Sequence, residues 1–359
     1  MNLFYAGEYL FENKTDVGVY TNRLLSYDYQ NKYVKVLIEE KEKFSLFLAG
    51  LDKFGKDEVS KYMELYLASP EDEQGLKLSA NVLFSYLLQQ NKVDNFKNTY
   101  QIGKLFVDSG AFSAWTKGVK IDVDKYVEWL NDRPQIDLFG QVDVIPGDRV
   151  CGATKQQVKK AAKETWENYL YMRDRVNNKN GLLYTFHVGE PLEYLENALE
   201  WVDENNKHIP YIALGGMVGK PKKVRDTFLQ NCFDIIYKSS NPTVNVHAFG
   251  MTDFDLLEKY PIHSADSTSW IMVGAMGNIM SDFGTITVSE NKQGESTHWK
   301  RLSDSQIKEF EKKIERFGFT LQELSISRDK RIMLNAMYMM EKAKKIKQVE
   351  YKPKNRRLF

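Results

Sequence analysis

The sequence predicts an α/β protein whose core is a parallel barrel. From residue 100 onward, short apolar runs alternate with amphipathic helical segments, and each run ends in Gly, Asp or Pro. Strands that alternate with crossover helices are the signature of a parallel sheet. The runs are apolar almost throughout, as expected for strands buried on both faces. Because no GxGxxG motif follows the first strand, we expect a TIM-type (β/α)8 barrel rather than a dinucleotide-binding fold.

The predicted elements follow one another along the chain. Residues 3–6 and 34–38 are apolar runs that we expect to form N-terminal strands. Residues 57–90 repeat apolar side chains at a spacing of three and four, which predicts helices. The later strands are centred near residues 107, 140, 185, 213, 246 and 266. Together with the N-terminal strands, these units approach the number of strands that a barrel requires.

One large domain with additions at both ends fits this pattern. We expect residues 1–300 to form the barrel, with a helical insertion near residues 52–98. Residues 284–288 are expected to add a strand or hairpin, and residues 303–348 are expected to be helical. Residues 301–359 therefore form the predicted C-terminal helical extension, which ends in a basic tail.

Composition limits the classes of function. The chain has 359 residues, 42% hydrophobic and 28% charged, an ordinary globular mixture. A net charge of +1 provides no dominant cationic field, so nucleic-acid binding would depend on local basic patches. Two cysteines and five histidines without ligand-type spacing predict no metal site, and we expect no cofactor. The sequence has neither a signal-peptide pattern nor an apolar stretch of ~20 residues, so we expect a cytoplasmic protein without a membrane partner.

Polar residues that directly follow the apolar runs are the candidates for a functional site. In a parallel barrel the carboxyl ends of the strands carry the active site, because the loops that follow them converge there. These candidates are Asp108, Ser109, Asp143, His187 with Glu190, Gly215, Gly216, His247 and Asp266 with Ser267. Since three of them are aspartates, we expect three carboxylates to share one pocket.

Three carboxylates in one pocket can divide the work of exchanging a base. One can attack a sugar C1′ and hold the sugar as an ester, while a second moves the proton that the leaving or entering base needs. A third can accept hydrogen bonds from the N1–H and 2-amino donors of guanine. The backbone at Gly215 and Gly216 can approach closely and donate to the base carbonyl. Phe112 and Phe249 can stack on the two faces of a planar base.

Each of these residues also has a purely structural interpretation. An aspartate at a strand end is often the N-cap of the next helix. His187 and His247 can be buried histidines with satisfied nitrogens, and the two glycines can serve turn geometry alone. Phe112 and Phe249 can belong to the core. The joint occurrence of these features in one order favours the functional interpretation.

Five segments resemble the tRNA-guanine transglycosylase superfamily. They are DSGAFSAW (108–115), QVDVIPGD (141–148), HVGEPLEYLE (187–196), ALGGMVG (213–219) and HAFGMTDFDLLEKYPIHSADSTSW (247–270). They look closest to the phage and bacterial branch of DpdA-like DNA-guanine transglycosylases. The resemblance covers roughly residues 100–280.

The resemblance implies a TIM-barrel glycosyltransferase that exchanges guanine in a polynucleotide for a 7-deazaguanine base. It implies a covalent enzyme–sugar intermediate, with Asp266 as the nucleophile and Asp108 as the general acid/base. Asp143 matches the aspartate that recognises the base. The remaining residues that we expect to bind substrate are Ser109, Phe112, His187, Gly215, Gly216, His247 and Phe249.

Two departures from the family pattern bear on the substrate. The tRNA enzymes carry a CxCxxC zinc site and a histidine after the nucleophile, whereas no cysteine follows Cys232 here. The segment 187–189 replaces the family's glutamine-containing turn. The missing zinc site favours DNA over tRNA as the partner. We therefore expect a DNA-guanine transglycosylase that inserts a queuosine-related base such as 7-cyano-7-deazaguanine.

Local basic residues are the expected contacts to nucleic acid. Lys220, Lys222, Lys223 and Arg225 follow the Gly-Gly turn, close to the predicted site, and are placed to bind phosphate. The alternative interpretation is a solvated helix face.

Other functions stay open at this point. The first alternative is a tRNA-guanine transglycosylase, and the second is a carboxylate-based hydrolase of nucleosides or glycosides. A third is an accessory module that binds nucleic acid without catalysis. The strand-end carboxylates favour an enzyme over such a module, because binding alone does not require them.

Overall fold

The computed structural model describes residues 64–68, 81–99, 104–147, 152–347 and 349–353. The strands expected at residues 3–6 and 34–38 lie outside the described residues, as does the last part of the basic tail.

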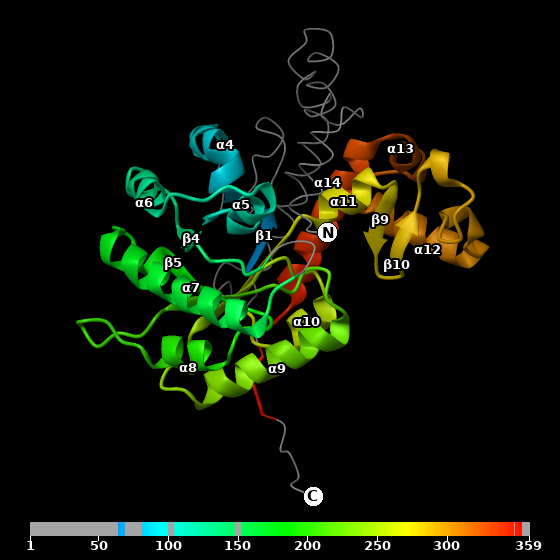
Figure 1. Ribbon diagram of the computed structural model, residues 1–359. Coiled ribbons are helices and arrows are strands. Elements are labelled where there is room, and N and C mark those ends of the chain that lie inside the picture. The colour runs from blue at the N-terminus through cyan, green and yellow to red at the C-terminus, as the bar shows by residue number, and fades with distance from the viewer. Residues whose placement is uncertain (1–63, 69–80, 100–103, 148–151, 348, 354–359) are drawn as a thin grey trace, which may run out of the picture.

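The strands β1 to β8 pair in parallel in the order in which they occur in the chain. They are β1 (Glu64–Ala68), β2 (Asn81–Ser85), β3 (Leu105–Asp108), β4 (Leu138–Gly140), β5 (Leu182–His187), β6 (Tyr211–Gly215), β7 (Asn245–Ala248) and β8 (Ser264–Ser267). The sheet closes because β8 also pairs with β1, where Tyr66 lies opposite Asp266. Helices surround the strands (Figure 1). The predicted α/β class with a parallel, barrel-like sheet is confirmed.

Helices follow the strands from β2 to β8 along the chain. They are α4 (Tyr86–Thr99), α5 (Ala111–Lys117), α6 (Val123–Asn131), α7 (Lys155–Arg175), α8 (Glu193–Glu200), α9 (Lys222–Lys238), α10 (Phe254–Lys259) and α11 (Ser269–Ala275), with a 3-10 turn, η2 (Lys179–Gly181), before β5. Local signals fix where several of them begin. The side chain of Asp122 accepts the backbone N–H of Lys125 at the start of α6, and Thr154 and Gln157 form a capping box at the start of α7.

The interior of the barrel is filled by side chains from alternate strand positions. The inner cluster consists of Leu83, Phe106, Leu138, Leu183, Tyr211 and Ala213, with Phe249 packed against it. Neighbouring positions such as Val82 and Phe84 belong instead to the larger core shared with the helices. Because the inside is packed, a binding site can form only at an end of the barrel.

The prediction of helices across residues 57–90 is wrong for two segments of this stretch. Glu64–Ala68 is strand β1 and Asn81–Ser85 is strand β2, so this part of the expected helical insertion belongs to the sheet. Among the described residues of this stretch, the helical ones belong to α4, which begins at Tyr86. A short apolar run cannot be assigned to helix or strand by spacing alone. Here Val82, Leu83 and Phe84 are all buried, as a strand covered on both faces requires.

The region after α11 forms a separate lobe beside the barrel. The antiparallel strands β9 (Asn278–Ser281) and β10 (Gly284–Thr287) lead through η3 (Glu290–Lys292) and η4 (Trp299–Arg301) to α12 (Asp304–Glu315), α13 (Leu321–Ile326) and α14 (Arg328–Lys345). The lobe lies to the right of the barrel in Figure 1. The predicted hairpin and C-terminal helices are confirmed, while a domain boundary at residue 300 stays a prediction.

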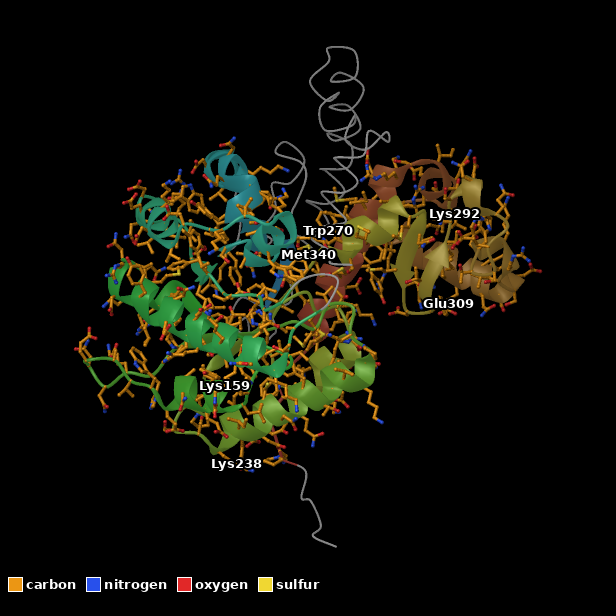
Figure 2. All side chains as sticks on the ribbon, viewed as in Figure 1. Lys159, Lys238, Trp270, Lys292, Glu309 and Met340 are labelled. Carbon is orange, nitrogen blue, oxygen red and sulfur yellow. The ribbon has the colours of Figure 1, made fainter. Side chains whose placement is uncertain are left out.

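Helix α14 returns the chain from the lobe to the barrel. It packs along α11 and also reaches β1. Trp270 of α11 and Met340 of α14 are both buried near the centre of the molecule, whereas Lys159 and Lys238 lie at its periphery (Figure 2). The lobe is therefore joined to the barrel through a packed pair of helices.

The side chain of Asn335 on α14 forms hydrogen bonds that stabilise this junction. It is completely buried, and its Nδ2 donates to the carbonyl oxygens of Trp270 at 3.2 Å and of Asn278 at 3.4 Å. Its Oδ1 accepts the backbone N–H of Met280 at 2.7 Å. One amide thus satisfies backbone groups of α11 and of β9.

We expect Asn335→Leu to destabilise the protein by about 1–3 kcal/mol, because the buried backbone groups lose their partner and leucine offers none. Chemical denaturation followed by circular dichroism measures this change. The exposed residue Lys308 on α12 provides the control, since Lys308→Ala should stay within about 0.5 kcal/mol of the wild type. Equal effects of the two substitutions would contradict the role given to Asn335.

Candidate active site

The carboxyl ends of the strands bring the predicted residues together. Asp108 ends β3, His187 ends β5 opposite Gly215 of β6, and Asp266 lies in β8. Asp143 follows β4 by three residues and contacts His187. Parallel strands present their carboxyl ends at the same edge, so these side chains share one end of the barrel.

Asp108 lies close to Phe249 and beside the chain at Gly140. A Cβ atom placed on Gly140 would be 3.7 Å from Asp108 Oδ1 and 3.8 Å from Phe249 Cζ, both ordinary contact distances, so the chain at Gly140 passes close to both side chains. The Oδ2 atom of Asp108 accepts the backbone N–H of Gly110 at 3.0 Å. Gly110 has a φ of +81°, and a Cβ there would lie 2.6 Å from Ser85 Oγ. The turn after β3 therefore requires glycine.

The environment of Asp108 favours its neutral form. Burial, together with the charges of Asp143 and Asp266, raises the pKa of Asp108 to about 7, although the Gly110 amide and the charge of His187 act in the opposite direction. A carboxyl group with this pKa can both give and take a proton near neutral pH.

Asp266 is held from beneath by a chain of buried polar groups. Its Oδ1 accepts the backbone N–H of Gly250 at 2.8 Å and lies 3.2 Å from His247 Nε2. His247 Nδ1 lies 2.6 Å from the hydroxyl of Ser264, which in turn is hydrogen-bonded to Tyr211. Because a carboxylate offers only acceptors, His247 Nε2 must carry a proton.

The second oxygen of Asp266 is free of these contacts. Oδ2 is buried and has no hydrogen-bond partner among the described residues. Buried polar atoms without partners are uncommon, and each indicates a functional role or strain. The carboxylate is thus fixed through one oxygen, while the other has no hydrogen-bond partner among the described residues.

Two residues that we expected to bind substrate form hydrogen bonds within the protein. His247 and Ser109 are completely buried. His247 contacts Asp266 and Ser264 through its two ring nitrogens, and the Ser109 hydroxyl accepts the N–H of Ala111 at the start of α5. Both residues therefore support the site in this structure, and their contact with substrate stays a prediction, as it does for the equally buried Asp266.

His187 connects two carboxylates. Its Nε2 lies 3.1 Å from Asp143 Oδ2, and its Nδ1 lies 3.2 Å from Glu190 Oε1. The Glu190 carboxylate also accepts the backbone N–H of His187 at 3.0 Å. A Cβ on Gly215 would lie 2.7 Å from the His187 ring, so glycine at this position makes room for the imidazole.

The two phenylalanines are partly buried. Phe249 packs against the rings of His247, at a centroid distance of 4.6 Å, and Phe106, at 5.7 Å. Phe112 packs against Trp115 with a centroid distance of 5.4 Å, and the Trp115 indole donates to the carbonyl oxygen of Gly147. Trp115 thereby ties the helix that carries Phe112 to the loop that carries Asp143.

The basic residues after the Gly-Gly turn differ in their surroundings. Lys222 pairs with Asp253 and Asp255, and Arg225 pairs with Asp253 at 3.0 Å. Lys220 and Lys223 form no ion pair with a described residue. Half of the predicted phosphate contacts are therefore already neutralised by aspartates.

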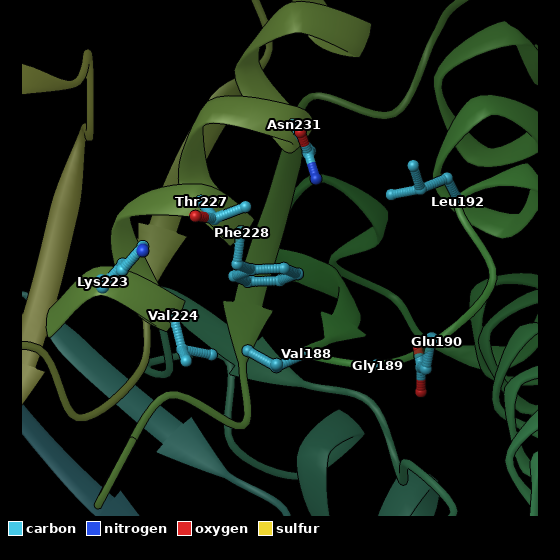
Figure 3. A pocket seen from close by; sticks show the side chains of 9 residues that line it. All are labelled: Val188, Gly189, Glu190, Leu192, Lys223, Val224, Thr227, Phe228 and Asn231. Carbon is cyan, nitrogen blue, oxygen red and sulfur yellow. The ribbon is translucent and has the colours of Figure 1, made fainter. Parts of the chain in front are cut away.

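A groove of about 450 Å³ lies beside the site (Figure 3). The residues that line it are Val188, Gly189, Glu190, Leu192, Lys223, Val224, Thr227, Phe228 and Asn231. They come from the loop after β5 and from α9, and most of the lining is apolar. Because Glu190 both lines the groove and binds His187, the groove lies next to the ion pairs that join Asp143, His187 and Glu190.

The sequence analysis did not predict several residues that support the site. Ser264 lies two residues before Asp266 in β8, and side chains two apart in a strand share a face, so this position was accessible to prediction. Tyr211, Gly140 and Trp115 carry no comparable signal, because their roles depend on contacts between distant segments.

Neither protein-family models nor curated proteins show a match to this chain. Within the described ranges, no group of three or more His, Cys, Asp or Glu side chains is arranged to hold a metal ion. In the same ranges, no helix is both long and apolar enough to cross a membrane.

We expect Asp108→Asn to stabilise the protein in a manner that depends on pH. The folded state raises the pKa of Asp108 from 3.8 to about 7, so stability is lost as the pH rises through this interval. The asparagine variant avoids this loss and should gain roughly 2–4 kcal/mol at about pH 8, and clearly less at about pH 5.

Denaturation curves at the two pH values measure the gain. Asp174→Asn changes an exposed aspartate of α7 and should alter stability little at either pH. A gain for Asp108→Asn that does not depend on pH would contradict the proposed origin in ionisation.

Proposed function

We propose that this chain is a TIM-barrel glycosyltransferase that exchanges guanine in DNA for a 7-deazaguanine base. One observation carries the proposal. Asp108 and Asp266 share one end of the barrel, yet their surroundings prepare them for different tasks. Asp108 is poised to transfer protons, while Asp266 is oriented by two donors and keeps one oxygen free. Two carboxylates with divided roles are what covalent base exchange requires.

The first half of the reaction makes the covalent intermediate. Asp266 Oδ2 attacks C1′ of the target deoxyribose, and the bond between C1′ and N9 of guanine breaks. The neutral Asp108 carboxyl gives its proton to the departing base. Since Asp266 has no solvent exposure, entry of the nucleotide must displace the groups that cover it.

The second half reverses these roles for the incoming base. The Asp108 carboxylate removes the N9 proton of the 7-deazaguanine, and N9 attacks C1′. The ester bond to Asp266 breaks and its carboxylate is regenerated. Asp143 accepts hydrogen bonds from the N1–H and 2-amino groups of the base, and backbone N–H groups near Gly215 and Gly216 bind its carbonyl oxygen.

The region after the nucleophile supports DNA rather than tRNA as the substrate. In the tRNA enzymes that the sequence resembles, zinc-binding cysteines follow the nucleophile. In this chain both cysteines precede Asp266, and the lobe formed by β9, β10, α12 and α13 occupies the corresponding stretch. The unpaired side chains of Lys220 and Lys223 are the nearest candidates of the predicted basic cluster for phosphate contacts.

The proposal predicts a covalent adduct between the protein and DNA. Wild-type protein incubated with a guanine-containing duplex should form a species that survives denaturing electrophoresis. Asp266→Asn should abolish it, because an amide oxygen is a poor nucleophile. Asp108→Asn should slow base exchange by about 10²–10⁴-fold, the usual contribution of general acid/base catalysis.

Exchange is measured as incorporation of labelled 7-cyano-7-deazaguanine into DNA, with tRNA and free deoxyguanosine tested in parallel. Glu258→Gln, which changes an exposed carboxylate on α10, should behave as the wild type. Incorporation into tRNA alone would identify the tRNA enzyme. Turnover of free nucleoside without polynucleotide would identify a hydrolase.

A further inference from the structure

A buried chain of ion pairs runs from the base-recognising aspartate toward the groove. Asp143, His187 and Glu190 follow one another in this chain at distances of 3.1 Å and 3.2 Å. The side chains are only 12%, 18% and 4% exposed, respectively. Solvent therefore screens these pairs far less than it screens an ion pair on the surface.

The local backbone holds the chain in place. Glu190 accepts two hydrogen bonds from the same residue, one from the His187 ring and one from its backbone N–H. In return, the Glu190 N–H donates to the His187 carbonyl oxygen at 3.2 Å. The ring lies against Gly215, where any larger residue would collide with it. His187 thus has one defined position.

We infer that His187 is a positioning residue that donates both ring N–H groups to carboxylates, and thereby holds the Asp143 side chain aimed at the base. The inference rests on the proposed function, because it assigns Asp143 to the recognition of guanine. It goes further in stating that His187 does not bind the base itself. A doubly protonated imidazole has two donors and no acceptor, and both donors are used.

The electrostatics of the chain agree with this assignment. Burial opposes a charge on His187, but the hydrogen bonds to Asp143 and Glu190 and the charges of these carboxylates outweigh burial and raise the pKa of His187 to about 10. The ring therefore stays positively charged throughout the neutral range. The positive charge of His187 also acts on a third carboxyl group, because it lowers the pKa of Asp108.

The arrangement dictates how the base is read. Asp143 Oδ2 is engaged by His187, which leaves Oδ1 to accept from the N1–H and 2-amino edge of guanine. Because His187 has no donor left, the base carbonyl must be bound by the backbone near Gly215 and Gly216. Selectivity for a 2-amino purine then depends on Asp143, and the orientation of Asp143 depends on His187 and Glu190.

Two substitutions separate these effects. Glu190→Gln keeps the shape of the anchor but removes its charge, while His187→Gln removes the charged ring. We expect both to raise the KM for the base and to reduce the preference for guanine over hypoxanthine by about tenfold or more, the value of one hydrogen bond to a charged group. Hypoxanthine is the probe because it lacks the 2-amino group.

The pH profile distinguishes the two variants. His187→Gln removes a positive charge near Asp108, so the pKa of Asp108 rises and the alkaline limb of the exchange profile moves to higher pH. Glu190→Gln leaves the ring charged at neutral pH, so this limb should stay in place. Glu193→Gln is the matched control. Glu193 lies three residues after Glu190 in the sequence, but its side chain is exposed and pairs with Lys159.

Nuclear magnetic resonance of the His187 ring in the free full-length protein gives a readout that does not depend on activity. The ring should remain protonated well above pH 7 in the wild type and lose its proton at lower pH in Glu190→Gln. A wild-type ring that titrates near its ordinary pKa of 6.5 would overturn the inference. If the wild type exchanges bases, an unchanged preference for guanine over hypoxanthine in both His187→Gln and Glu190→Gln would also overturn the inference. Absence of exchange in the wild type, with the expected titration, would instead refute the proposed function alone.

Discussion

The structure of the site depends on how three aspartates share one end of a packed barrel. Like charges in a poorly solvated place repel one another, so the fold must provide a separate solution for each carboxyl group. Asp108 is favoured in its neutral form, Asp143 pairs with His187, and Asp266 accepts hydrogen bonds from Gly250 and His247. The three carboxyl groups therefore have different neighbours, and they differ in protonation, ion pairing and hydrogen bonding.

The supporting groups come from both inside and outside the barrel. Beneath Asp266, a series of buried polar side chains runs through the interior from Tyr211 on β6 to Ser264 on β8 and His247 on β7. Beside Asp143, the loop after β5 provides the ion-pair partners, and Trp115 anchors the neighbouring loop at Gly147. The three aspartates are thus held by contacts from several strands and loops, and glycine is required where these contacts are closest, as at Gly110 and Gly215.

The sequence predicted some parts of this arrangement well and others poorly. Strands β3 to β8 were predictable because their apolar runs end in Gly, Asp or polar residues that open the following loops. Strands β1 and β2 were not, since their runs of only three or four apolar residues fit either a helix or a strand. The role of His187 could not be predicted, because its ring charge depends on two partners brought together only by folding. Likewise, no sequence pattern reveals that Asp253 neutralises both Lys222 and Arg225.

The connection of the lobe to the barrel has an evolutionary consequence. The chain leaves the barrel at the end of α11 and returns along α14, and these two helices pack against each other. The ends of the inserted segment are therefore neighbours in space, and its length does not affect how the sheet closes. Such a segment behaves as an exchangeable module. Its length and sequence can change while the strand ends that carry Asp108, Asp143 and Asp266 keep their places in the barrel.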